Sequence, residues 1–62
     1  MMYKIELYVM SYPLPYKREL TAQDQRQAED IALKTYKTDP YVQGIRITDP
    51  NGVVILKRGV LR

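Results

Sequence analysis

Neither cysteine nor histidine occurs in this chain of 62 residues, and that combination constrains the fold more than any other feature of the sequence. A chain of this length buries only about 60% of the surface that its unfolded form exposes, so we expect one domain, residues 1–62, with one small core. Without cysteine no disulfide supports that core, and without both residue types the common zinc sites and Ser-His-Asp triads are excluded. Apolar packing must therefore hold the core, alone or with a partner chain.

Two segments near the start alternate between apolar and polar side chains, which predicts strands with one buried face. In residues 3–10 the apolar set consists of Tyr3, Ile5, Leu7 and Val9. Residues 11–15 contain two prolines and are expected to form a loop. Residues 16–22 resume the alternation more weakly, with Leu20 and Ala22 on one side. They predict a second strand, paired with the first and lying at the edge of the sheet.

The period changes to that of a helix after Asp24. The stripe that faces the core is expected to hold Ala28, Ile31, Ala32 and Thr35. Asp24 followed by Gln27 is typical of a capping box, although Thr21 with Asp24 would begin the helix one turn earlier. We favour Asp24 because it leaves residues 17–22 free to form a strand. Asp39-Pro40 is expected to end the helix.

Residues 44–58 predict a β-hairpin. The turn Asp49-Pro50-Asn51-Gly52 joins two apolar segments, and Gly52 suits the positive φ that such a turn requires. If Asp49 lies opposite Val53, then Thr48 lies opposite Val54 and Ile47 opposite Ile55. The core face would then hold Ile45, Ile47, Val53 and Ile55, and the other face would hold Arg46, Thr48, Val54, Leu56 and Arg58.

The element order strand, strand, helix, strand, strand predicts an α+β fold, ββαββ, in which one helix covers one face of a four-stranded antiparallel sheet. The first strand is the most regular and apolar, so we place it centrally and expect the sheet order 2-1-3-4. No apolar run approaches the ~20 residues of a membrane span, and Lys4 and Glu6 interrupt the first segment. We therefore expect a cytoplasmic protein that does not bind membranes.

Few residues in this chain suggest catalytic chemistry. Asp24, Asp39 and Asp49 already have expected places at a helix end or a turn. A pair of catalytic carboxylates needs a cleft, which one helix on one sheet does not provide. Gly44 and Gly52 do not form a phosphate-binding loop, because neither lies between a strand and a helix. We expect no enzymatic activity, no metal and no cofactor.

Two surface features instead point to binding. Tyr8 and Met10 are expected beside Arg46, Val54, Leu56 and Arg58 on the uncovered face of the sheet, a mixture typical of an interface. The alternative is that Val54 and Leu56 only favour β-structure on a half-exposed strand. The net charge of +3 favours an acidic protein groove or nucleic acid as partner. The basic residues expected on the sheet are Lys17, Arg18, Arg46, Lys57, Arg58 and Arg62.

Residues 19–58 resemble a family of small phage-encoded proteins, the type I-F anti-CRISPR proteins. The resemblance rests on the stretch from Glu19 to Ala32, with its Ala-x-x-Ile-Ala spacing, and on Gly44-Ile-Arg-Ile-Thr48 leading through Asn51-Gly52 into an apolar strand that ends in Lys. The chain is also similar in pattern to the small phage inhibitor of bacterial RNA polymerase.

The resemblance implies a non-enzymatic inhibitor that binds the Cascade surveillance complex and blocks its target-DNA groove with basic residues on and near the helix. The resemblance implies a basic pair at the positions that Glu29 and Asp30 occupy in this chain, and only Lys34 retains the positive charge. The contact is therefore expected mainly on the sheet. The expected partner-binding residues are Tyr8, Lys17, Arg18, Lys34, Arg46, Val54, Leu56, Lys57 and Arg58. The expected partner is a host protein complex, either a Cascade-type complex or RNA polymerase, and nucleic acid is the alternative. The chain itself is expected to be a monomer or a homodimer.

Overall fold

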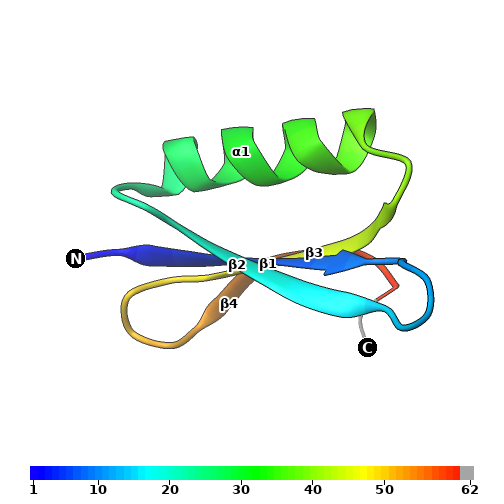
Figure 1. The fold of residues 1–62 in the computed structure, drawn as a ribbon. Coiled ribbons are helices and arrows are strands. Elements are labelled where there is room, and N and C mark those ends of the chain that lie inside the picture. The colour runs from blue at the N-terminus through cyan, green and yellow to red at the C-terminus, as the bar shows by residue number, and fades with distance from the viewer. Residues whose placement is uncertain (61–62) are drawn as a thin grey trace.

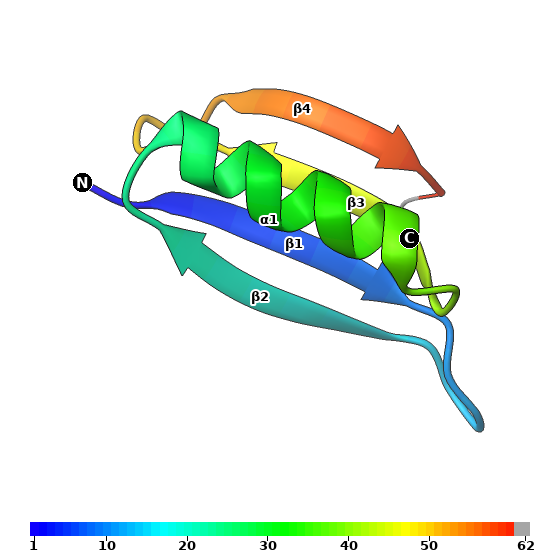
Figure 2. The same cartoon turned by 90° about the horizontal axis from the view of Figure 1, so that it is seen from above.

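The alternating segments form strands and the segment after Asp24 forms a helix in the computed structural model, which describes residues 1–60. The elements are β1 (Tyr3–Val9), β2 (Tyr16–Ala22), α1 (Gln25–Thr38), β3 (Val42–Thr48) and β4 (Val54–Gly59). All strand pairs are antiparallel, and the sheet order is β2-β1-β3-β4. Figures 1 and 2 show α1 lying over one face of this sheet, above its central strands. The predicted α+β fold and strand order are therefore confirmed.

The side chains of Asp24 and Gln27 cap the start of α1. The Asp24 carboxylate accepts a hydrogen bond from the backbone N–H of Gln27 at 2.8 Å. The side-chain oxygen of Gln27 in turn accepts one from the backbone N–H of Gln23 at 2.9 Å. Such bonds satisfy donors that have no partner within the helix. The helix ends at Thr38, and Asp39, directly before Pro40, is its C-cap, so both predicted boundaries are confirmed.

The core lies between α1 and the sheet. Ala28 and Ala32 are fully buried, and their small side chains allow the helix to approach the strands closely. Ile31 and Tyr36 pack at the margins of this contact. The buried apolar residues are Ile5, Leu7, Val9, Ala22, Ala28, Ala32, Val42, Ile45 and Ile47. No helix in residues 1–60 is both long enough and apolar enough to cross a membrane.

The turn of the hairpin forms as predicted. The Asp49 carboxylate accepts hydrogen bonds from the backbone N–H groups of Asn51 and Val53 at 2.9 and 2.8 Å. The backbone N–H of Asp49 donates to the carbonyl of Val53 at 2.8 Å, and Thr48 lies opposite Val54. Gly52 has the expected positive φ of 86°.

Beyond the turn, the predicted register of β4 is wrong. A bulge leaves Ile55 as an extra residue, so Leu56 rather than Ile55 lies opposite Ile47. Arg58 consequently lies opposite Ile45. Because directly opposite residues share a face of the sheet, Leu56 and Arg58 are on the helix side, not on the uncovered side as predicted. Val53, predicted in the core, is 56% exposed.

The uncovered face, here called the open face, carries polar and charged side chains. The strand register places on it Lys4, Glu6, Tyr8, Lys17, Glu19, Thr21, Gly44, Arg46, Thr48, Val54 and Lys57. Arg18 lies opposite Leu7 and therefore belongs to the helix side of the edge strand β2. The four strands carry six basic and two acidic residues, whereas residues 24–39 carry three basic and four acidic ones. The sheet is therefore more basic than the helix, as predicted.

A second bulge anchors the end of β4. Tyr8 lies opposite Gly44 but Val9 lies opposite Val42, which leaves Gln43 without a partner on β1. The carbonyl of Gln43 instead accepts a hydrogen bond from the backbone N–H of Val60 at 2.9 Å. Gly59, which directly precedes Val60, has a φ of 74°. A Cβ at this position would overlap the carbonyl oxygen of Gln43 and the Tyr36 hydroxyl.

We expect Gly59→Ala to lower the free energy of unfolding by about 2 kcal/mol, because it adds both backbone strain and a clash with a backbone carbonyl. Gly52→Ala is the matched control: its φ is also positive, but a Cβ there meets nothing within 4 Å. It should cost about 1 kcal/mol. Urea unfolding followed by far-UV circular dichroism measures both changes. Equal losses in the two variants would show that the contact with Gln43 does not anchor the strand.

Candidate functional site

An acidic side chain is buried on the open face, where no helix covers it. Glu6 is only 2% exposed. Arg46 binds it in a bidentate manner, with its Nε 2.7 Å from one carboxylate oxygen and a terminal nitrogen 2.9 Å from the other. The Nζ of Lys17 lies 3.0 Å from the second oxygen. Glu6, Lys17 and Arg46, here called the ionic cluster, thus join β2, β1 and β3.

The ionic cluster shifts the titration of all three groups. The hydrogen bonds from Arg46 lower the pKa of Glu6 from 4.5 to about 2, opposed by burial and reinforced by Lys17. The hydrogen bond to Glu6 raises the pKa of Lys17, and the same carboxylate raises the pKa of Arg46. All three groups therefore stay charged throughout the physiological range.

Tyr8 lies beside the ionic cluster on the open face. The guanidinium carbon of Arg46 lies 5.9 Å from the centre of the Tyr8 ring, within the range of a cation–π contact. The Arg46 guanidinium is therefore paired with the Glu6 carboxylate and also contacts an aromatic ring. A side chain held in this way loses little conformational freedom when a partner binds it.

The cluster presents positive charge to solvent. Its acid is sealed from water, whereas the side chains of Lys17 and Arg46 are 44% and 33% exposed. Lys57 is exposed and lies opposite Arg46 on β4. The second acid of the open face, Glu19, lies directly opposite Glu6 on β2, and its carboxylate is 3.6 Å from Nζ of Lys4. The open face is cationic overall because its four basic residues, Lys4, Lys17, Arg46 and Lys57, outnumber these two acids.

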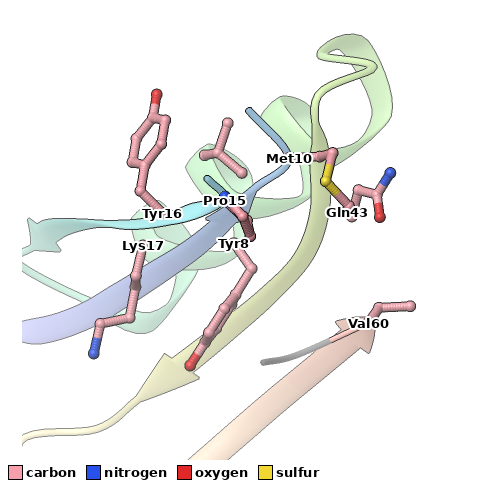
Figure 3. Close-up of a pocket in the computed structure, with 8 residues that line it drawn as sticks. Tyr8, Met10, Pro15, Tyr16, Lys17, Gln43 and Val60 are labelled. Carbon is pink, nitrogen blue, oxygen red and sulfur yellow. The ribbon is translucent and has the colours of Figure 1, made fainter. Parts of the chain in front are cut away.

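A cavity of ≈ 250 Å³ opens where β1 ends and β2 begins. Figure 3 shows that the side chains of Tyr8 and Lys17 extend to the same side of the sheet, whereas Tyr16 extends to the other side. The residue directly opposite Tyr8 on β3 is Gly44, which has no side chain, and the side chain from β3 that reaches the ring is that of Arg46. The lining residues are Tyr8, Val9, Met10, Pro15, Tyr16, Lys17, Gln43 and Val60.

The structure brings together only some of the residues that the sequence predicted for binding. Those on the open face are Tyr8, Lys17, Arg46, Val54 and Lys57; those on the helix side of the sheet are Arg18, Leu56 and Arg58. Lys34 lies on the exposed outer surface of α1. Arg62 lies outside the described residues.

Sequence reasoning missed Glu6 and the cavity. The signal for Glu6 is an acidic residue in an alternating strand, with a basic residue on each neighbouring strand. This signal can be used only when the register of the three strands is known. Gln43, which lines the cavity, lies at a bulge for which the sequence offers no local signal. Within residues 1–60, no group of three acidic side chains could hold a metal ion.

The fold and this site define a small α+β protein of ββαββ order with a cationic sheet face. Comparison with known proteins finds no matching family model, no matching curated protein and no matching solved structure. The resemblance to anti-CRISPR proteins and the inhibitor function that it implies therefore stay predictions.

Proposed function

We propose that this chain is a small non-enzymatic binding protein that inhibits a host nucleic-acid-handling complex, a Cascade-type complex, by occupying an acidic patch on its protein surface. The observation that carries the proposal is the charge of the open face. Lys17 and Lys57 are exposed on it and Arg46 is half-buried, while the acid that neutralises part of their charge is buried. An acidic protein surface is the complement of such a face.

The geometry favours binding by occupancy. Lys17 and Arg46 are held in place by Glu6, so their side chains are ordered before a partner arrives. Val54 is 44% exposed on the same face and adds apolar area beside Lys57. Charged side chains at the rim and apolar or aromatic side chains between them are the usual components of a protein interface.

Two adjacent residues on β4 provide a matched test. Lys57 is on the open face and Arg58 is on the helix side, so Lys57→Glu and Arg58→Glu make similar charge changes on opposite faces. We expect Lys57→Glu to weaken binding to a purified type I-F Cascade complex by about tenfold or more, and Arg58→Glu to change it little. Surface plasmon resonance measures the affinity, and a DNA gel-shift assay with Cascade measures inhibition.

Several outcomes would overturn this proposal. Equal losses from the two variants would place the contact elsewhere than on the open face. Inhibition of purified RNA polymerase without an effect on Cascade would show that the target is RNA polymerase and not a Cascade-type complex. Micromolar binding to DNA in the absence of any host protein, weakening steeply with salt, would replace a protein partner by nucleic acid.

A further inference from the structure

We propose that the cavity beside Tyr8 is a socket for one apolar side chain of the partner, presented by a segment that carries acidic residues on either side. The inference rests on the proposed function and deepens it, because it names the part of the partner that the open face receives. It follows from the size, the rigidity and the charge of the cavity.

The size of the cavity suits a single side chain. Its volume of ≈ 250 Å³ lies below the range of about 300–1,000 Å³ that is typical of sites for drug-sized ligands. The apolar residues Met10, Pro15 and Val60 line it together with Tyr8. Apolar sockets of this kind, filled by one anchoring side chain, supply much of the affinity in protein interfaces.

Backbone hydrogen bonds hold the walls in position. The N–H of Met10 donates to the carbonyl of Tyr41 at 2.7 Å, and the N–H of Val60 donates to the carbonyl of Gln43 at 2.9 Å. Tyr8 belongs to a central strand, with β2 on one side and β3 on the other. The cavity therefore exists before binding, and little conformational entropy is lost when it is filled.

The charge of the cavity selects an acidic segment. Among the described residues that line it, only Lys17 is charged. Its ammonium group has three donors and contacts Glu6 with one of them, and 44% of the side chain remains exposed. Arg46 adds a second, half-buried cation next to Tyr8. A carboxylate beside the inserted apolar side chain would find a donor at the rim of the socket.

The test is a titration of isotope-labelled protein with short peptides, followed by NMR chemical shifts. The first probe is the blocked peptide Asp-Asp-Phe-Asp-Asp; the controls are Asp-Asp-Ala-Asp-Asp and Lys-Lys-Phe-Lys-Lys. We expect the first probe to shift the signals of Tyr8, Met10 and Val60, with a dissociation constant on the order of 1 mM. Both controls should bind at least about tenfold more weakly.

Two valines that flank β4, Val53 just before it and Val60 just after it, supply matched variants. Val60 lines the cavity and is 52% exposed, whereas Val53 lies beside the distant turn with a similar exposure. Val60→Glu should abolish the shifts because it places a negative charge at the socket. Val53→Glu, which changes the net charge equally, should leave them intact.

Equal binding of the phenylalanine and alanine peptides, or equal loss in the two variants, would overturn the socket. The titration needs no host complex, so its failure is distinct from failure of the proposed function. Peptide binding without Cascade binding would retain the socket and reject the target. Cascade binding that Val60→Glu leaves unchanged would retain the target and reject the socket.

Discussion

Lowering the pH from 6 to 2 is expected to remove about 3 kcal/mol of stability through Glu6 alone. The pKa of this carboxyl is about 2 in the folded protein, against an ordinary value of 4.5. A lowered pKa means that the ionised form binds its partners in the folded state, so the stabilisation is complete above pH 4.5 and is lost as the pH falls towards 2. A chain of this length has a total stability of roughly 3–9 kcal/mol, so the effect is large.

Glutamine substitutions separate this contribution from that of the other acids. Protonated glutamate and glutamine have nearly the same shape, so the free energies of unfolding of the natural protein and of Glu6→Gln should converge near pH 2 and diverge as the pH rises. Glu19→Gln is the control, because Glu19 lies opposite Glu6 on β2 but is half-exposed. It should retain the full pH dependence. Parallel pH profiles for the natural protein and Glu6→Gln in urea unfolding would disprove the role of Glu6.

Replacing Arg46 with alanine is expected to lower the free energy of unfolding by about 3 kcal/mol at pH 7. The substitution removes both hydrogen bonds of the bidentate pair and leaves a buried carboxylate with Lys17 as its remaining ion-pair partner. It also removes the contact with the Tyr8 ring. Deleting one partner of a buried ion pair lowers the free energy of unfolding far more than deleting one partner of an exposed pair.

Lys57→Ala provides the comparison for Arg46→Ala. Lys57 lies opposite Arg46 and is exposed, so its removal should change stability by less than about 0.5 kcal/mol. Chemical unfolding of both variants at pH 7 measures the difference. If Arg46→Ala is no more harmful than Lys57→Ala, the ionic cluster does not stabilise the fold, and Arg46 would be free to serve the partner alone.

The elements that repeat a simple period were predictable. Alternation in residues 3–10 assigned the buried side of β1 correctly, and Asp24 with Gln27 marked the start of α1 because capping depends on neighbours in sequence. The turn at Asp49–Gly52 was predictable for the same reason. The central position of β1 was predicted from its regular apolar face, because such a strand is best buried when another strand pairs with it on each side.

The faces of β4 were not predictable because residues 53–56 are all apolar. Four consecutive apolar residues satisfy either register equally, so alternation carries no information there. The bulge at Ile55 lets both Ile55 and Leu56 pack against the core, a gain that exists only once β3 and α1 are in place. The same dependence on tertiary structure hid the ionic cluster and the cavity, since both arise from the pairing of distant segments.

The bulge at Ile55 also has a consequence for how the sequence of this protein can change. Loss of Ile55 would leave Leu56 opposite Ile47 and Lys57 opposite Arg46, because the extra residue takes no part in the pairing. Loss of Lys57 would instead bring Arg58 onto the open face and alter the charge that a partner meets. In evolutionary terms, Ile55 is the position at which β4 can shorten by one codon while every later residue keeps its face.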